Sequence, residues 1–337
     1  MERILWMMNA LVTGGAGFIG SHLVRELLAR SYEVTVIDDL STGSIRNIED
    51  LLGRDDFDFI EGDVRRRQLL APLMEKADYC YHLAAAVGVK RIVDEPLSSL
   101  EALVHGTCSV LEQADRWQVP LFLSSTSEVY GKRGAQDMRE DTPSLIGPVA
   151  RWRWLYACAK MLDEFWALAY HRENGLPVVV ARLFNVSGPR QTGRWGMVIP
   201  TFVSQALADD PITVYGDGTQ KRCFLHVTDC VEAIMRLTEC QEAIGRVVNI
   251  GSTHEFSINE LAKRVLRLVP GSRSQIAHIS YENAYAAGFE DVRERKPDTA
   301  LLESLTGFEP QFTLDDIISD ICEYSMAGAA SPLMAVS

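Results

Sequence analysis

The feature that most constrains the fold is a glycine-rich turn between an apolar strand and an apolar helix near the start of the chain. Ala10 to Val12 form the predicted strand, and Gly14, Gly17 and Gly20 follow in a G-x-x-G-x-x-G spacing. Glycine suits these positions because the backbone must turn sharply, approach a pyrophosphate and let the helix pack close to the strand. The helix N-terminus then presents amide donors to the anion. The pattern predicts a dinucleotide-binding unit.

The second predicted strand indicates which dinucleotide this is. Glu33 to Ile37 end in Asp38, about 20 residues after the turn, as this fingerprint expects. We expect Asp38 to accept hydrogen bonds from the adenosine ribose, where a carboxylate repels a 2′-phosphate, so the sequence predicts NAD rather than NADP. Later strand ends meet the same cofactor. The expected cofactor-binding residues are Gly14, Gly17, Phe18, Ile19, Asp38, Asp63, Val64, Leu83, Ala84, Ala85, Tyr156 and Lys160.

The order of predicted elements indicates an α/β fold. Predicted strands at 57–64, 79–83 and 119–124 alternate with helical patterns, including one at 100–117. This alternation predicts a Rossmann-type doubly wound parallel sheet with its site at the carboxyl ends of the strands. A chain of 337 residues also has room for a smaller α/β substrate-binding domain. We expect the NAD-binding domain at 1–182 with a returning segment at 223–251, the nucleotide-sugar-binding domain at 183–222 and 252–325, and a flexible tail at 326–337.

Charge and composition exclude several classes of protein. A formal net charge of -13 opposes binding to a phosphate backbone, so we expect no nucleic-acid partner. The seven cysteines are scattered without a CxxC pair, which is typical of reduced thiols in the cytoplasm. The histidines lack metal-ligand spacing, and no apolar run approaches the ~18 residues of a membrane span, so we expect neither a metal nor a membrane.

A tyrosine and a lysine in the middle of the chain form the candidate catalytic pair. Tyr156 and Lys160 are four residues apart, so on a helix they face the same way. An ammonium beside a phenol favours the phenolate, which lets a group with an ordinary pKa near ~10 act as a base near neutral pH. Oxidation of a sugar hydroxyl requires such a base.

These motifs together resemble the extended short-chain dehydrogenase/reductase family of nucleotide-sugar epimerases, dehydratases and decarboxylases. The likeness rests on the glycine turn, Asp38, the Tyr156/Lys160 pair and the stretch Ser-Thr-Ser-Glu-Val-Tyr-Gly that begins at Ser125. Within the family, Thr-Ser-Glu-Val-Tyr-Gly and the later Arg-Lys-Pro segment at Arg295 are similar to UDP-glucuronate decarboxylases. The resemblance implies NAD-dependent decarboxylation of UDP-glucuronic acid through a UDP-4-keto-hexuronic acid, giving UDP-xylose, UDP-4-keto-pentose or both.

The resemblance also implies roles for individual residues. Thr126 holds the sugar 4-hydroxyl with Tyr156, Glu128 orients the carboxylate and relays a proton, and Ser127 and Arg295 position the acidic group. The implied catalytic residues are Thr126, Ser127, Glu128, Tyr156, Lys160 and Arg295, and the implied substrate-binding residues are Arg153, Asn185, Arg190, Arg222 and Arg295.

Other functions stay open at this point. Ser127 stands where 4,6-dehydratases have an aspartate, and Glu128 stands where plain 4-epimerases usually have no carboxylate. The alternatives are a UDP-glucuronate or UDP-hexose 4-epimerase, a UDP-apiose/UDP-xylose synthase, and a regulatory protein that binds the cofactor without turnover. Leu103 replaces the asparagine that is common in the family helix after the fourth strand.

The two central helices indicate the assembly. Apolar residues lie on more than one face of each, including Leu103, Leu111, Phe165, Trp166 and Tyr170. One face covers the sheet, and we expect the surplus to pair with a second subunit in a homodimer.

Overall fold

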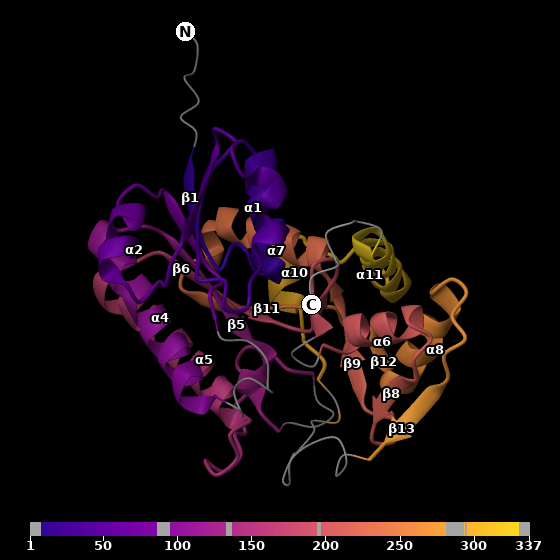
Figure 1. The fold of residues 1–337 in the computed structure, drawn as a ribbon. Coiled ribbons are helices and arrows are strands. Elements are labelled where there is room, and N and C mark those ends of the chain that lie inside the picture. The colour runs from indigo at the N-terminus through magenta and orange to yellow at the C-terminus, as the bar shows by residue number, and fades with distance from the viewer. Residues whose placement is uncertain are drawn as a thin grey trace.

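The computed structural model describes residues 8–85, 95–132, 137–193, 197–280, 293 and 295–329. Its centre is a seven-stranded parallel sheet with the strand order β11-β6-β5-β4-β1-β2-β3 (Figure 1). The strands are β1 (Asn9–Thr13), β2 (Glu33–Asp38), β3 (Phe57–Glu61), β4 (Tyr79–His82), β5 (Leu121–Thr126), β6 (Val178–Leu183) and β11 (Arg246–Ile250). The order reverses between β1 and β4, which is where a doubly wound sheet binds its ligand. The predicted fold is confirmed.

Helices cover both faces of this sheet. One face packs against α1 (Phe18–Ala29), α7 (Val227–Glu239) and α10 (Ala300–Thr306), and the other packs against α2 (Arg67–Met74), α4 (Pro96–Trp117) and α5 (Trp154–Asn174). Neighbouring residues of β1 face opposite sides, so Val12 joins the first apolar cluster and Leu11 joins the second. Burial on both faces explains why the strands are continuous apolar runs. The helix α4 begins four residues before the predicted Leu100, because Pro96 is suited to a first helical turn.

A second group of elements lies to one side of the sheet, at the right of Figure 1. It has its own apolar cluster, to which α6, α8 and α11 contribute. Its elements are α6 (Val198–Leu207), β8 (Ile212–Tyr215), β9 (Lys221–Cys223), β12 (Glu255–Ser257), α8 (Ile258–Leu268), β13 (Ile276–Ile279) and α11 (Leu314–Ala329). Strands β8 and β13 pair in parallel, and β9 and β12 pair antiparallel. Two further short strands, β7 (Val186–Ser187) and β10 (Leu225–His226), pair with each other in parallel.

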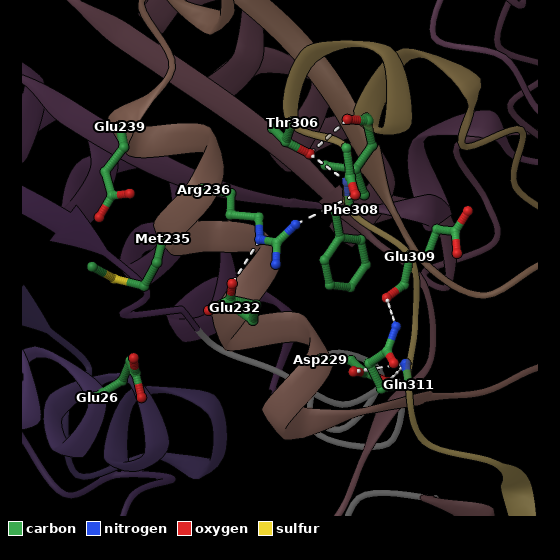
Figure 2. A network of polar contacts seen from close by, with 12 residues as sticks. Glu26, Asp229, Glu232, Met235, Arg236, Glu239, Thr306, Phe308, Glu309 and Gln311 are labelled. Carbon is green, nitrogen blue, oxygen red and sulfur yellow. Dashed lines mark hydrogen bonds and ion pairs between the residues drawn. The ribbon is translucent and has the colours of Figure 1, made fainter.

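Polar contacts fasten the segment after α10 to α7 (Figure 2). Both carboxylate oxygens of Asp229 accept the backbone N–H of Gln311 at 3.1 Å. Further along α7, Arg236 donates to Glu232 and to the carbonyl of Gly307. The segment that enters α11 is therefore held against the helix that follows β10.

The C-terminal helix is longer than predicted. The sequence predicts an irregular tail from Met326, but α11 continues to Ala329. The remaining part of the predicted tail, 330–337, lies outside the described residues. Among the described helices, none has both the length and the apolar character that a membrane crossing requires. All seven cysteines are free thiols.

Candidate active site

The glycine turn has the close packing that its sequence predicts. Gly14 has φ +75°, and a Cβ on this residue would lie 2.6 Å from the backbone nitrogen of Ala84. Gly20 would collide with the carbonyl of Gly14 if it carried a side chain. Gly17 is the N-cap of α1 and provides no side chain to cap the first-turn amides. The backbone thus leaves these donors available to an anion.

Asp38 lies at the carboxyl end of β2, beside this turn. Its two carboxylate oxygens accept the backbone N–H groups of Ala16 at 3.0 Å and Leu40 at 2.9 Å. Burial raises the pKa of Asp38, and the two backbone hydrogen bonds offset part of that rise. Each oxygen keeps a lone pair, so the carboxylate is fixed in position and can still accept a hydroxyl.

The other expected cofactor residues gather at the same edge of the sheet. Phe18 and Ile19 form the first turn of α1, and Val64 is buried after β3. A cavity of about 320 Å³ lies at the carboxyl ends of β2 and β3, lined by Asp39, Glu61, Gly62, Asp63 and Arg66. Asp63 itself is bound to Arg65.

The segment after β4 completes that edge. Leu83 N–H donates to the carbonyl of Thr13, and Ala84 N–H donates to the Thr13 hydroxyl at 3.2 Å. Ala85 packs in a small cluster with Tyr156 and with Leu103. Four strand ends therefore surround one site, although they are far apart in the sequence.

The prediction that Lys160 lowers the pKa of Tyr156 is wrong for this structure, in which that pKa is raised. Both residues lie on α5 in register, but the Lys160 ammonium donates to Asp163 Oδ2 at 2.9 Å. The pKa of Tyr156 is raised, first because the protein shields its hydroxyl from water and then because the charges of Glu128 and Asp163 oppose a phenolate. A hydrogen bond with Thr126 acts in the opposite direction.

The predicted carboxylate and arginine meet directly. Arg295 Nη1 donates to Glu128 Oε1 at 2.8 Å and lies 3.5 Å from Ser127 Oγ. Glu128 and Ser127 belong to the short helix η3 (Ser127–Tyr130), which Thr126 caps by accepting Glu128 N–H. Burial opposes ionisation of Glu128, but the charges of Arg295 and Arg153 outweigh it, so the pKa of Glu128 is lowered. Glu128 is a carboxylate surrounded by cations.

The four further substrate residues lie in different settings. Arg153 forms an ion pair with Glu128 at 4.0 Å, and Arg222 on β9 also lowers the pKa of Glu128 by its charge. Asn185 donates its side-chain amide to the carbonyl of Cys223. Arg190 approaches Ser21 of α1 at 3.4 Å. The structure brings Arg153 to Glu128, whereas the Asn185 amide is already bound to backbone.

Asp163, which the sequence motifs do not indicate, is completely buried beside Lys160. A lysine and an aspartate three residues apart on one helix face could have indicated the pair. In the described part of the chain, no cluster of three or more His, Cys, Asp or Glu side chains could hold a metal ion.

Comparison with known proteins places these features in context. The model of the GDP-mannose 4,6 dehydratase family matches residues 11–321. A UDP-N-acetyl-alpha-D-glucosaminuronate decarboxylase of Bacillus cytotoxicus is 38% identical over 94% of this chain and 97% of its own. UDP-glucuronic acid decarboxylase 1 of Xenopus tropicalis is 35% identical over 93% of this chain and 71% of its own.

A solved structure shows the same arrangement of elements. The UDP-glucuronic acid 4-epimerase of Bacillus cereus, in complex with UDP-glucuronic acid and NAD, superposes with a TM-score of 0.85. It is 28% identical, and the match covers 95% of this chain and 99% of that one.

Proposed function

This chain belongs to the extended short-chain dehydrogenase/reductase family, since the GDP-mannose 4,6 dehydratase model matches it over residues 11–321. From this membership and the geometry of the site, we propose that it is an NAD-dependent decarboxylase of UDP-glucuronic acid. The observation that carries the proposal is the contact of Arg295 with Glu128 beside Ser127, on the side of the site that also contains Tyr156. Two relatives with 38% and 35% identity are named decarboxylases of UDP-uronic acids.

The chain fits NAD at the edge formed by the first four strands. Gly14 and Gly17 leave backbone amides accessible at the start of α1, and Asp38 would hold the adenosine ribose. NAD supplies the hydride acceptor and a positive charge on the nicotinamide. The NAD in the Bacillus cereus epimerase complex supports the same cofactor here.

In the first step, Tyr156 takes the proton from the sugar 4-hydroxyl while Thr126 holds that hydroxyl. The pKa of Tyr156 is raised by burial and by two carboxylates, so positive charge near the ring is needed before the phenolate can form. The Lys160 ammonium provides one such charge, but it also donates a hydrogen bond to the Asp163 carboxylate, which offsets part of that charge. We infer that Tyr156 becomes a base only in the loaded site.

In the second step, the oxidised sugar loses its carboxylate. A ketone at C4 is β to the C5 carboxylate, so loss of carbon dioxide leaves an enolate that the carbonyl stabilises. The guanidinium of Arg295 would hold the substrate carboxylate, and its Nε is buried without a partner among the described residues. Glu128 would then lie against a like charge, and the repulsion is relieved when neutral carbon dioxide leaves. Glu128 would relay a proton from water to C5 of this enolate. Return of the hydride would then give UDP-xylose, whereas early release would give UDP-4-keto-pentose.

One observation favours a second candidate substrate. The Bacillus cytotoxicus relative, at 38% identity, is named for the N-acetylated uronate. The same carboxylate chemistry serves UDP-N-acetylglucosaminuronic acid, because the acetamido group at C2 takes no part in it. Parallel incubations of the protein and NAD with each UDP-sugar would rank them by carbon dioxide release. The proposal fails if neither sugar loses carbon dioxide.

We further propose a homodimer, two structural domains at the predicted boundaries and a cytoplasmic location. Leu103 and Leu111 are buried inside the subunit, so these two belong to the faces that pack within it. Phe165 is 67% exposed, and Leu162 and Leu100 are also exposed on α5 and α4. These three side chains are the apolar surface that supports pairing with a second copy. Unpaired cysteines support a reducing compartment.

A further inference from the structure

A line of buried hydrogen bonds joins Lys160 to the first strand of the sheet. Asp163 Oδ2 accepts both from Lys160 Nζ and from the hydroxyl of Thr107, each at 2.9 Å. The Thr107 oxygen lies 3.2 Å from His82 Nε2, and His82 Nδ1 lies 2.7 Å from Thr13 Oγ1. The line crosses from α5 through α4 and β4 to the end of β1, where the glycine turn begins.

The donors along this line all point the same way. Thr107 gives its only hydroxyl proton to Asp163, so its oxygen must accept a proton from His82 Nε2. His82 Nδ1 is then the acceptor and Thr13 the donor, while the Thr13 oxygen accepts Ala84 N–H. Burial lowers the pKa of His82 to about 3, which agrees with this single neutral tautomer. Every dipole in the line therefore favours negative charge on Asp163. Burial raises the pKa of this carboxyl, and the charge of Lys160 and the hydrogen bonds from Lys160 and Thr107 offset part of that rise.

The same carboxylate competes with Tyr156 for the charge of Lys160. Lys160 is 2% exposed and Asp163 is 0% exposed, so water screens neither group. Asp163 Oδ1 has no hydrogen-bond partner among the described residues, whereas Oδ2 accepts from both Lys160 and Thr107, so the oxygen that faces the ammonium is the one that is held in place. Its closest charged contact is the ammonium that lies one turn after Tyr156.

We propose that Asp163 is a positioning residue that controls Tyr156 through Lys160, because it fixes the ammonium in place and cancels part of its charge. The inference rests on the proposed function only in treating Tyr156 as the base. Asp163 keeps the phenol protonated until positive charge enters the site, which prevents a reactive phenolate in the empty enzyme.

The other charges around this pair are few and fixed. On α5, Glu164 is bound by two hydrogen bonds to Arg182 of β6. From η3, Glu128 faces Tyr156 and also opposes its ionisation. From β4, His82 is neutral, and from α4, Thr107 carries no charge. Removal of the Asp163 charge is therefore the change that most directly increases the effect of the Lys160 charge on the ionisation of Tyr156.

The test is a titration of the Tyr156 phenol in the enzyme loaded with NAD. Ultraviolet spectra are recorded against pH for wild type and for Asp163→Asn, and the spectrum of the matching Tyr156→Phe variant is subtracted from each. The remaining signal gives the pH at which Tyr156 ionises. Asparagine has nearly the same shape and removes the charge, so the midpoint should fall by about one unit. An unchanged or higher midpoint overturns the inference.

Thr107→Val is the matched control, because it removes a hydrogen bond to the same oxygen and leaves the carboxylate charge. Its midpoint should not fall, and a fall equal to that of Asp163→Asn contradicts the inference. If Asp163→Asn does not fold, Asp163→Ser gives the same change of charge. Failure of both to fold would show that Asp163 serves the fold and would also overturn the inference. The titration contains no sugar, so its result is independent of whether UDP-glucuronic acid is decarboxylated.

Discussion

Arg295 Nη1 lies 2.8 Å from Glu128 Oε1, although the two residues are 167 positions apart in the chain. The contact joins η3, which follows the fifth strand of the parallel sheet, to the segment just before α10. Both side chains are largely buried, so removal of one leaves the other with an uncompensated charge. We propose that this pair lies where the carboxylate of the sugar binds.

The Glu128 charge should matter for decarboxylation more than for binding. Glu128→Gln keeps the shape and removes the charge, so we expect UDP-glucuronic acid to bind while the rate of carbon dioxide release falls 10²- to 10⁴-fold, roughly the usual effect of a positioned proton-transfer group. Single-turnover carbon dioxide release and calorimetric binding measure the two effects. Glu303→Gln, on the exposed surface of α10, is the control and should behave as wild type.

Removal of the Arg295 charge should change the pH dependence. The pKa of Glu128 is lowered because Arg295 and Arg153 outweigh burial, so Arg295→Met should raise that pKa. Glu128 then becomes protonated in mild acid, and activity at about pH 5 to 6, relative to activity near pH 8, should fall below the wild-type ratio. The adjacent Lys296→Met removes a surface cation and should leave the ratio unchanged. An identical ratio in Arg295→Met and wild type would contradict this assignment.

Asp38 should select the cofactor. The carboxylate is fixed by two backbone N–H groups where we propose that the adenosine ribose binds, so NAD should bind at least tenfold better than NADP, a difference of about 1.4 kcal/mol. Asp38→Asn should narrow this ratio, because the repulsive charge is lost. Isothermal calorimetry measures both ligands, with Asp56→Asn, a partly exposed residue just before β3, as a control. Equal affinities in wild type would remove the basis for the NAD assignment.

The exposed apolar residues on α4 and α5 should form the subunit contact. Phe165→Glu places a charge in the centre of that surface, so sedimentation velocity at micromolar concentration should show a shift from dimer to monomer. Tyr324→Glu changes an exposed aromatic residue on α11 and should leave the dimer intact. Wild-type protein that sediments only as a monomer would disprove the proposed assembly.

Local sequence signals predicted the elements and the close packing of the glycine turn and the strand that ends in Asp38. The glycine turn and Asp38 act through backbone geometry and strand position, and the structure confirms both their elements and their close packing. The family resemblance predicted that Glu128 and Arg295 act at the same carboxylate, and the two side chains are in contact in the structure. Spacing on one helix also placed Tyr156 and Lys160 correctly on α5.

Properties that depend on burial could not be read from spacing. The sequence predicts that Lys160 lowers the pKa of Tyr156, but in the structure that pKa is raised, first because the hydroxyl is shielded from water and then because the charges of Glu128 and Asp163 oppose a phenolate. Leu103 and Leu111 are buried and Phe165 is exposed, although all three are apolar residues of the same two helices and the sequence does not distinguish them. The spacing of apolar residues shows which side of a helix is apolar, but it does not show whether the same subunit or a second subunit covers that side.

The most direct test of the account is to incubate the purified protein with UDP-glucuronic acid and NAD and to follow the products by mass spectrometry, with Tyr156→Phe in parallel. We expect wild type to release carbon dioxide and to form UDP-xylose, UDP-4-keto-pentose or both. Tyr156→Phe should produce neither NADH nor carbon dioxide, because the base for the first step is missing. Formation of UDP-galacturonic acid without carbon dioxide, at a rate that Glu128→Gln leaves unchanged, would contradict the account and identify a 4-epimerase.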